Sequence, residues 1–156
     1  MDKTDFSILS LLQDDGKLSN AKLAEKLNLS ETPCWRRVKR LEAEGYIDSY
    51  QANLNKRKLG FGVMAFVQLT YTAHDNKTTE NFEALIAECD NVLSCHNTTG
   101  NADFLLQVVA RDLDDYSQFV DNVLRKLPGI SDISSSISLR ELKSSSRLPL
   151  NTIEKT

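Results

Sequence analysis

The sequence predicts an α+β protein with two domains, a winged-helix-like helix-turn-helix at the N-terminus and a ferredoxin-like βαββαβ domain after it. Two observations lead to this fold class. In the first 45 residues, apolar side chains recur at helical spacing in three short segments. From Phe61 onward, period-two segments typical of strands alternate with helical segments in the order strand-helix-strand-strand-helix-strand. The 156 residues are enough for two small domains, each with a modest core.

The first helix is predicted over residues 2–13 and the second over residues 19–27. Asp2 is placed to cap the first helix, with Asp5 three residues later in the manner of a capping box. Ser19 is placed to cap the second helix, and a short turn leads from it into the third. The apolar faces of these two helices comprise Ile8, Leu9, Leu12, Leu23, Ala24 and Leu27.

The third helix has an apolar face that is unusually narrow. Cys34, Val38 and Leu41 fall at positions i, i+4 and i+7 and form a single stripe. Gly45 follows on the same side and is suited to end the helix, because glycine adopts positive φ without strain. Two residues are suitable caps for the start of this helix: Ser30 and Thr32.

The opposite face of the third helix is cationic. Four basic residues and no acidic one lie between positions 32 and 41. An isolated charged face is usually just solvated. Here, however, a short helix and a turn over residues 28–30 precede it, and this order is typical of a helix-turn-helix whose second helix enters the major groove of DNA. DNA contacts are therefore predicted from Ser19, Asn20, Ser30, Thr32, Trp35, Arg36, Arg37, Lys39 and Arg40.

The net charge of −3 is divided unevenly along the chain. Residues 1–60 hold 11 basic and 9 acidic residues, a net charge of +2. Residues 61–156 hold 8 basic and 13 acidic residues, a net charge of −5. The basic excess therefore lies with the helix-turn-helix, and the acidic half is expected to avoid nucleic acid.

A short strand is predicted over residues 46–52, which are rich in β-forming side chains, and it completes a first domain of residues 1–52. Residues 53–60 form the predicted linker. Its cations would contact phosphate or be merely solvated, and composition favours neither. The second domain is predicted at residues 61–142, followed by a Ser-rich tail, residues 143–156, that is expected to pack loosely.

The second domain begins with a strand, residues 61–71, in which every second residue from Phe61 to Leu69 is apolar. Two further strands flank Gly100, and a last strand is predicted over residues 130–142. The two helices between the strands have apolar stripes comprising Phe82, Leu85, Ile86 and Cys89 in one, and Tyr116, Phe119, Val120, Val123, Leu124 and Leu127 in the other.

Both faces of the predicted sheet carry apolar residues. Met64 and Phe66 point to one face of the sheet, and Val63 and Val67 point to the other. Leu105 and Phe104 likewise point to opposite faces. Two helices can cover only one face of such a sheet. The other face is expected to meet the sheet of another copy of the chain.

Sequence motifs follow one another in a definite order along the whole chain. They are Asp2-Lys3-Thr4-Asp5, Leu12-Gln13-Asp14-Asp15-Gly16, Leu18-Ser19-Asn20, Leu29 to Glu42, Gly45-Tyr46-Ile47 and Thr99 to Leu106. In this order they resemble the Lrp/AsnC family, the feast/famine transcription regulators of bacteria and archaea. The resemblance implies a sequence-specific DNA-binding transcription regulator that binds double-stranded DNA. It also implies homodimers, paired sheet to sheet, that often assemble into rings of eight.

The segment from Thr99 to Asp103 has two interpretations. Gly100 and Asn101 tolerate positive φ, so the segment by itself is a tight hairpin turn with a solvated carboxylate. The family resemblance implies instead that the turn lies between dimers and receives a small amino acid. Turn N–H groups would then bind the ligand carboxylate, and Asp103 would pair with its ammonium group. The effector-binding positions implied are Asn97, Thr99, Gly100, Asn101, Asp103, Ser136 and Ser138.

This chain departs from the family at Asn101 and Ala102, where an acidic and an aromatic residue are common. A less acidic and roomier pocket is therefore expected. The Thr32-Pro33-Cys34-Trp35 segment resembles a subgroup linked to cysteine handling. The candidate effectors are cysteine, methionine and leucine.

Other classes of function are less consistent with the sequence. Neither His74 nor His96 has a catalytic motif partner, so an enzyme is not expected. A sensor or scaffold without DNA binding is disfavoured by the intact basic segment from Arg36 to Arg40. No cofactor or metal is expected, since Cys95 and His96 would point to opposite faces of a strand. Without a membrane-spanning run or a signal peptide, the cytoplasm is the expected location.

Overall fold

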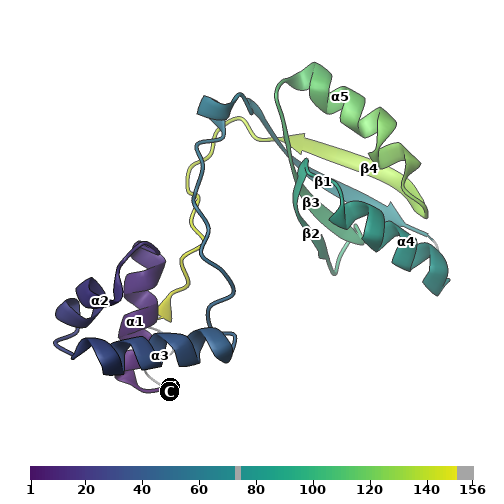
Figure 1. Cartoon of the computed structure of the whole chain (residues 1–156). Coiled ribbons are helices and arrows are strands. Elements are labelled where there is room, and N and C mark those ends of the chain that lie inside the picture. The colour runs from purple at the N-terminus through teal and green to yellow at the C-terminus, as the bar shows by residue number, and fades with distance from the viewer. Residues whose placement is uncertain (73–74, 151–156) are drawn as a thin grey trace. The chain divides into compact units, whose positions relative to one another are not determined.

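The computed structural model describes residues 1–72 and 75–150, which form two compact units. The first unit comprises Met1–Asn53 together with the chain from Lys143 onward, and the second comprises Leu54–Leu142. His74 and residues 151–156, the end of the predicted tail, lie outside the described residues. Figure 1 shows the helices of the first unit and the sheet of the second.

Three helices form the first unit: α1 (Lys3–Asp14), α2 (Asn20–Lys26) and α3 (Glu31–Ala43). The predicted caps of the first two helices are confirmed, with a full capping box between Asp2 and Asp5 and with the Ser19 hydroxyl accepting from Lys22 N. Helix α3 begins after Ser30 rather than Thr32. The core between the helices is formed by Ile8, Leu23, Ala24, Cys34, Val38 and Leu41.

The turn between α2 and α3 depends on Asn28, which has φ 53°. Asparagine tolerates this left-handed conformation better than most residues with a side chain. The backbone N–H of Leu29 then donates to Ala24 O (2.9 Å), so the chain reverses sharply into α3. Helix α3 ends as predicted at Gly45 (φ 74°), where Tyr46 N donates back to Leu41 O (2.9 Å).

The strand predicted over residues 46–52 is not observed. This segment has no regular secondary structure, and Ile47 alone packs against the helical core. A strand needs a neighbouring strand to pair its backbone N–H and C=O groups, and the described part of this chain supplies none. The helix-turn-helix is thus confirmed, while a wing is absent from the described residues.

The second unit is the predicted ferredoxin-like arrangement. Its elements are β1 (Val63–Tyr71), α4 (Asn76–Ala87), β2 (Val92–Asn97), β3 (Phe104–Ala110), α5 (Leu113–Asn122) and β4 (Ile130–Ile137). The strands lie in the order β2-β3-β1-β4, and every neighbouring pair is antiparallel. Two short 3-10 helices, Arg57–Leu59 and Leu124–Lys126, precede β1 and β4.

Several boundaries in this unit differ from the prediction. Helix α5 ends at Asn122, and Leu124 of its predicted stripe lies in the 3-10 helix that follows. The last strand ends at Ile137 instead of Leu142, after which Ser138 N makes one more bond to Met64 O (2.8 Å). Cys89 lies beyond α4, half-buried, instead of on its buried stripe, and its thiol donates to Leu85 O (3.1 Å). Phe61 precedes β1 and is exposed, because the strand begins only at Val63.

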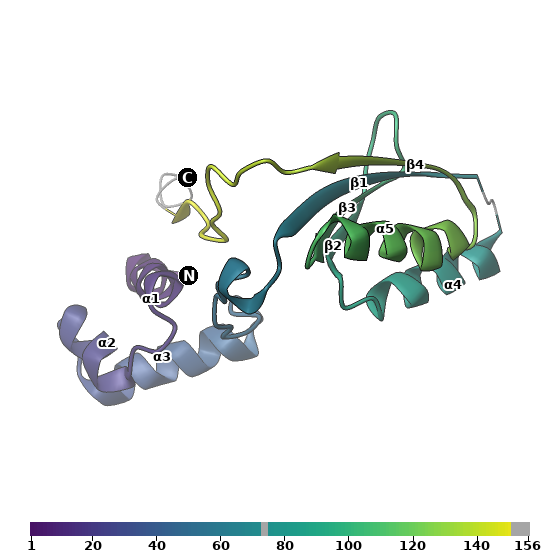
Figure 2. The same ribbon diagram turned by 90° about the horizontal axis from the view of Figure 1, so that it is seen from above.

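Helices α4 and α5 cover one face of the sheet (Figure 2). Between the helices and the sheet lie Ala65, Val67 and Leu69 of β1, with further core residues from every element. Three aromatic rings, Tyr71, Phe82 and Phe104, pack with their centroids 4.6–5.7 Å apart. This packing lies at the end of β1 and the start of β3, beside the hairpin that joins β2 to β3.

The other face of the sheet has neither α4 nor α5 over it (Figure 2). The register places apolar residues on this face, as predicted. Phe66 is 42% exposed there, although it lies in a central strand. Its register partners Gln107 and Ser136 are polar, while Met64, Leu105 and Val109 on the same face are apolar. We call the surface formed by Met64, Phe66 and Leu105 the open sheet face, with Val109 beside them only 5% exposed.

The described part of the C-terminal tail is largely exposed and makes polar contacts with α1. Leu148 N donates to the side-chain oxygen of Gln13 in α1 (2.6 Å), and Arg147 forms an ion pair with Asp14 (3.1 Å). The tail therefore belongs with the helical unit. The chain therefore passes between the two units twice, once before and once after the ferredoxin-like domain in the sequence.

Candidate DNA-binding and ligand-binding sites

Helix α3 has the two faces that its sequence predicts. Cys34 and Leu41 are fully buried and Val38 is 6% exposed, so the apolar stripe is turned into the core. Thr32, Trp35, Arg36, Lys39 and Arg40 are exposed, and Arg37 is partly buried at the edge. The helix thus presents a continuous polar and cationic surface to solvent.

The start of each motif helix adds small polar groups to this surface. Ser19 and Asn20 are exposed at the start of α2, where the Ser19 hydroxyl is already occupied as a cap. Ser30 is exposed at the start of α3 and makes no capping bond with its side chain. Backbone N–H groups at the start of a helix favour phosphate. The N-termini of α2 and α3 are therefore both suited to contact a DNA backbone.

Two of the four predicted DNA-contacting cations of α3 are held by carboxylates of α1. Arg37 Nη1 donates to Asp2 Oδ2 (2.7 Å) and to Asp5 Oδ1 (2.8 Å). Arg40 Nη2 donates to Asp5 Oδ2 (2.6 Å). We call these four residues the α1–α3 charge cluster. Each oxygen of Asp5 therefore has its own arginine, and the first turn of α1 is fastened to the middle of α3.

Asp5 is the one buried charged residue in the described part of the chain, with 1% of its surface exposed. Burial alone raises the pKa of a carboxyl group, but the Asp2 N–H and the guanidinium groups of Arg37 and Arg40 outweigh it. Together they lower the pKa of Asp5 to about 2. Asp5 is thus a permanently charged anchor at neutral pH.

Sequence reasoning placed Asp5 in a capping box and missed this second role. A signal was present, because Asp5 shares the spacing of Ile8, Leu9 and Leu12 and so lies on the buried face of α1. A carboxylate on a buried helical face requires a cationic partner. The sequence did not say which of several arginines would supply it.

The other two cations of α3 differ from each other. Lys39 forms an ion pair with Glu42 on its own helix (2.7 Å). Arg36 is exposed and forms no ion pair within residues 1–72 and 75–150. Arg36 is therefore the cation of this helix that is free to meet a phosphate or a base edge.

The turn between β2 and β3 is confirmed as a hairpin, with Gly100 at φ 129°. Its polar side chains are engaged in holding the turn. Asp103 Oδ2 accepts from Tyr71 N (2.7 Å) at the irregular end of β1, and Asn97 Nδ2 donates to Asp103 O (3.0 Å). Thr99, Gly100 and Asn101 remain exposed at the tip.

The predicted effector residues do not form one pocket within a single chain. Asn97 lies on β2 and Ser136 on β4, which are the two opposite edges of the sheet. Ser138 follows β4, beside Met64 at the start of β1. A site that used all seven residues would therefore need contributions from more than one copy of the chain.

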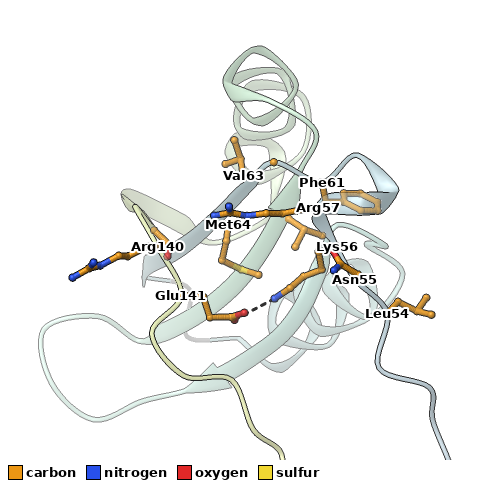
Figure 3. Close-up of a pocket in the computed structure, with 12 residues that line it drawn as sticks. Leu54, Asn55, Lys56, Arg57, Phe61, Val63, Met64, Arg140 and Glu141 are labelled. Atoms are coloured by element: carbon orange, nitrogen blue, oxygen red, sulfur yellow. Dashed lines mark hydrogen bonds and ion pairs between the residues drawn. The ribbon is translucent and has the colours of Figure 1, made fainter.

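Two cavities lie near these residues. One, of about 430 Å³, is bounded by α4 and β2 and includes Asn97, Glu83 and Cys95 in its lining. The other, of about 320 Å³, lies between the segments before β1 and after β4 and includes Ser138. Figure 3 shows the Lys56–Glu141 ion pair (3.4 Å) within this second cavity, with Arg57 extending towards Met64 and Arg140 pointing away.

The described residues contain no group of three or more His, Cys, Asp or Glu side chains arranged to hold a metal ion. Cys95 packs towards the core while His96 is exposed, as expected for neighbours on a strand. Burial raises the pKa of Cys34, Cys89 and Cys95 alike, which disfavours the reactive thiolate. In residues 1–72 and 75–150, no helix is long and apolar enough to cross a bilayer.

A helix-turn-helix with an exposed cationic helix, joined to a separate ferredoxin-like domain, defines a class of DNA-binding regulators with a ligand-binding domain. Two family models match the chain in succession. The model described as winged helix-turn-helix DNA-binding matches residues 1–48. The model described as the Lrp/AsnC ligand binding domain matches residues 64–148.

Similar proteins match over nearly the whole chain. The leucine-responsive regulatory protein of Salmonella typhimurium is 35% identical over 152 residues, covering 97% of this chain and 93% of that protein. The Bkd operon transcriptional regulator of Pseudomonas aeruginosa is 39% identical over 150 residues, covering 96% and 98%. A transcriptional regulator from Neisseria meningitidis, crystallised as a complex with L-Met, is 38% identical with a TM-score of 0.93, covering 98% and 99%.

The chain therefore belongs to the Lrp/AsnC family and is a DNA-binding transcription regulator. The resemblance predicted from the motifs between Asp2 and Leu106 is confirmed, as is the fold class.

The lowered pKa of Asp5 predicts acid sensitivity of the helical unit. A carboxyl group whose pKa is depressed on folding contributes its full stabilisation above the unfolded value of 3.8, and this is lost as pH falls through about 2. Replacing Asp5 with Asn should remove that dependence. Urea titrations give the difference in free energy of unfolding between the wild type and Asp5→Asn at each pH. This difference should be smaller at pH 2 than at pH 6, by about 1–2 kcal/mol. An equal difference at both pH values would contradict the charge cluster.

Proposed function

We propose that this regulator reads a specific operator with α3, assembles through the open sheet face, and responds to a small amino acid bound at the turn between β2 and β3. It would act in the cytoplasm, where it meets DNA. The observation that carries the proposal is the two-faced α3, whose stripe at Cys34, Val38 and Leu41 is buried while its cationic side is bare.

The proposed DNA interface consists of the exposed face of α3 and the starts of α2 and α3. Arg36 has no competing carboxylate among the described residues, so its guanidinium keeps all its donors for DNA. Trp35 beside it is 46% exposed, so its ring is also available to a partner of this face. Ser19, Asn20, Ser30 and Thr32 would add phosphate contacts that set the register.

Replacing Arg36 with Ala should weaken operator binding by about 1–3 kcal/mol, the range for loss of a bidentate base contact. Thermal stability should barely change, because the side chain is exposed. Gel shifts at several salt concentrations give the affinity, and for about six phosphate contacts per dimer the wild-type log–log slope should be near −5.

The control is Arg125→Ala, which removes the same charge from an exposed arginine of the ferredoxin-like unit. It should leave operator affinity unchanged. If Arg36→Ala binds as tightly as the wild type, the assignment of the DNA-reading face is wrong. A log–log salt slope near zero would show that this domain does not bind DNA through phosphate contacts.

The assembly proposal is supported by the open sheet face. Phe66, Met64 and Leu105 lie together on a surface that neither α4 nor α5 covers. Burial of apolar surface is worth about 25 cal/mol per Å², so covering this face with a second sheet would favour a dimer, against the cost of association. Such dimers are the unit from which we propose a higher oligomer, with an octamer as the expected ring.

Replacing Phe66 with Glu should therefore convert the protein to monomers at micromolar concentration, as followed by light scattering. The matched control is Leu85→Glu on α4, because Leu85 is 40% exposed and Phe66 is 42% exposed. The same charge at Leu85 should leave the dimer intact. A wild-type protein that is itself a monomer would show that the open sheet face has another role.

The effector proposal rests on the exposed tip at Thr99, Gly100 and Asn101 and on the separation of Asn97 from Ser136 within one chain. A ligand that touches both groups must bridge copies, so its binding would favour the assembled state by its differential affinity for that state. Leucine and methionine are favoured by the relatives named above, and cysteine remains a candidate from the Thr32 to Trp35 segment.

Replacing Asp103 with Asn should weaken the amino-acid response while leaving DNA affinity without effector intact. Asn retains a side-chain oxygen to accept the bond from Tyr71 N, so the turn should keep its shape while losing its charge. The measurement is calorimetric titration of wild type, Asp103→Asn and the exposed control Asp90→Asn with leucine, methionine and cysteine. An unchanged response in Asp103→Asn would move the site elsewhere, and no response in the wild type would indicate an effector-independent regulator.

A further inference from the structure

The α1–α3 charge cluster joins the DNA-reading helix to a helix that is not itself part of the helix-turn-helix motif. It contains two carboxylates, Asp2 and Asp5, and two guanidinium groups, Arg37 and Arg40, so its net charge is zero. The four basic residues of α3 therefore do not act as four equivalent charges. Arg37 and Arg40 are neutralised from α1, and Arg40 Nε also lies 4.0 Å from Glu44 Oε1. Lys39 is paired with Glu42, and Arg36 has no ion-pair partner among the described residues.

The bonds of the cluster hold both arginines but leave part of each one free. Arg37 uses a single nitrogen, Nη1, for both of its carboxylate contacts, and Arg40 uses Nη2 for its shortest one. A guanidinium group has five N–H donors. The side chains of Arg37 and Arg40 remain 33% and 46% exposed, so each can still present donors to a partner, but only in the direction that Asp5 dictates.

We propose that Asp5, assisted by Asp2, is a positioning residue that determines the operator selectivity of α3 by restricting where Arg37 and Arg40 can point. This inference rests on the proposed reading of DNA by α3. Asp5 is too deeply buried to touch DNA itself, so it acts through the two arginines.

The physical reason is the difference between phosphate contacts and base contacts. A long, unrestrained arginine on a helix in the major groove can swing to any nearby phosphate, and phosphate contacts carry no sequence information. An arginine held by a buried carboxylate has already lost its rotamer freedom before DNA arrives. Fixing Arg37 and Arg40 should thus lower the affinity for arbitrary DNA while leaving affinity for the matching operator high.

The test is Asp5→Asn, measured by fluorescence anisotropy on the operator and on a scrambled duplex across a range of salt concentrations. In this variant Arg37 keeps its bond to Asp2 and Arg40 keeps the longer contact with Glu44, but neither is held by Asp5. Their greater freedom should tighten binding to the scrambled duplex and steepen its log–log salt slope by up to about 1–2 per bound subunit. The ratio of operator affinity to scrambled affinity should fall at least about tenfold. Asp5→Glu keeps the charge and should restore part of the ratio.

The matched control is Asp14→Asn, at the other end of the same helix. Asp14 also pairs with an arginine, Arg147, so the control makes the same change of charge without releasing a cation of α3. Its selectivity ratio and salt slope should stay near those of the wild type. If Asp14→Asn shifts them as much as Asp5→Asn does, general charge is responsible and the proposal fails.

A second variant guards against a folding defect in Asp5→Asn. Asp2 is 53% exposed, and Asn caps helices as well as Asp does, so Asp2→Asn should fold normally while releasing one bond of Arg37. It should change the salt slope in the same direction by less than about one. Unchanged slope and ratio in both folded variants, with only a lower melting temperature, would make the cluster purely structural. If Arg36→Ala left operator affinity unchanged in the same assay, the proposed reading of DNA by α3 would itself be wrong.

Discussion

The narrow apolar stripe of α3 is the constraint on which the helical unit depends. Three side chains, Cys34, Val38 and Leu41, are the only ones of this helix that are buried in the core. So small a contact holds the helix without covering it, and most of its circumference stays available for DNA. A wider stripe would bind α3 more tightly but would bury the face that carries Arg36. The charge cluster with Asp5 supplies the orientation that three apolar contacts cannot supply alone, because ion pairs with fixed hydrogen-bond geometry are directional.

The ferredoxin-like unit likewise has too few helices to cover both faces of its sheet. Four strands expose two faces, and α4 and α5 cover one of them. Apolar residues on the open sheet face, including Phe66, are therefore left uncovered by α4 and α5. The same geometry separates the predicted effector residues, since the sheet order puts β2 and β4 on opposite edges. Assembly and ligand binding are linked in our proposal because both need a second copy of the chain.

Much of this fold follows from local chemistry. The capping box at Asp2 and Asp5, the Ser19 cap, the turn before Ser30 and the end of α3 at Gly45 depend on residues within one or two turns of each other, so periodicity and capping rules predict them. The strand predicted at residues 46–52 does not form within a single chain, for the opposite reason. Its β-forming side chains are a local property, whereas a strand exists only where a neighbour supplies hydrogen bonds.

The sequence by itself determined which face of α3 is buried, which half of the chain carries the basic excess, and the order of strands and helices, because each of these depends on spacing along the chain. Only the tertiary structure decided that Arg37 and Arg40 are held by Asp5 while Arg36 is free, since the partners are 32 and 35 residues apart. It also decided that Asp103 Oδ2 accepts a hydrogen bond from Tyr71 N and that Leu148 N donates one to Gln13 Oε1. Side-chain partners across such separations depend on how helices and strands pack, and a carboxylate in a sequence does not specify which of several donors it will meet.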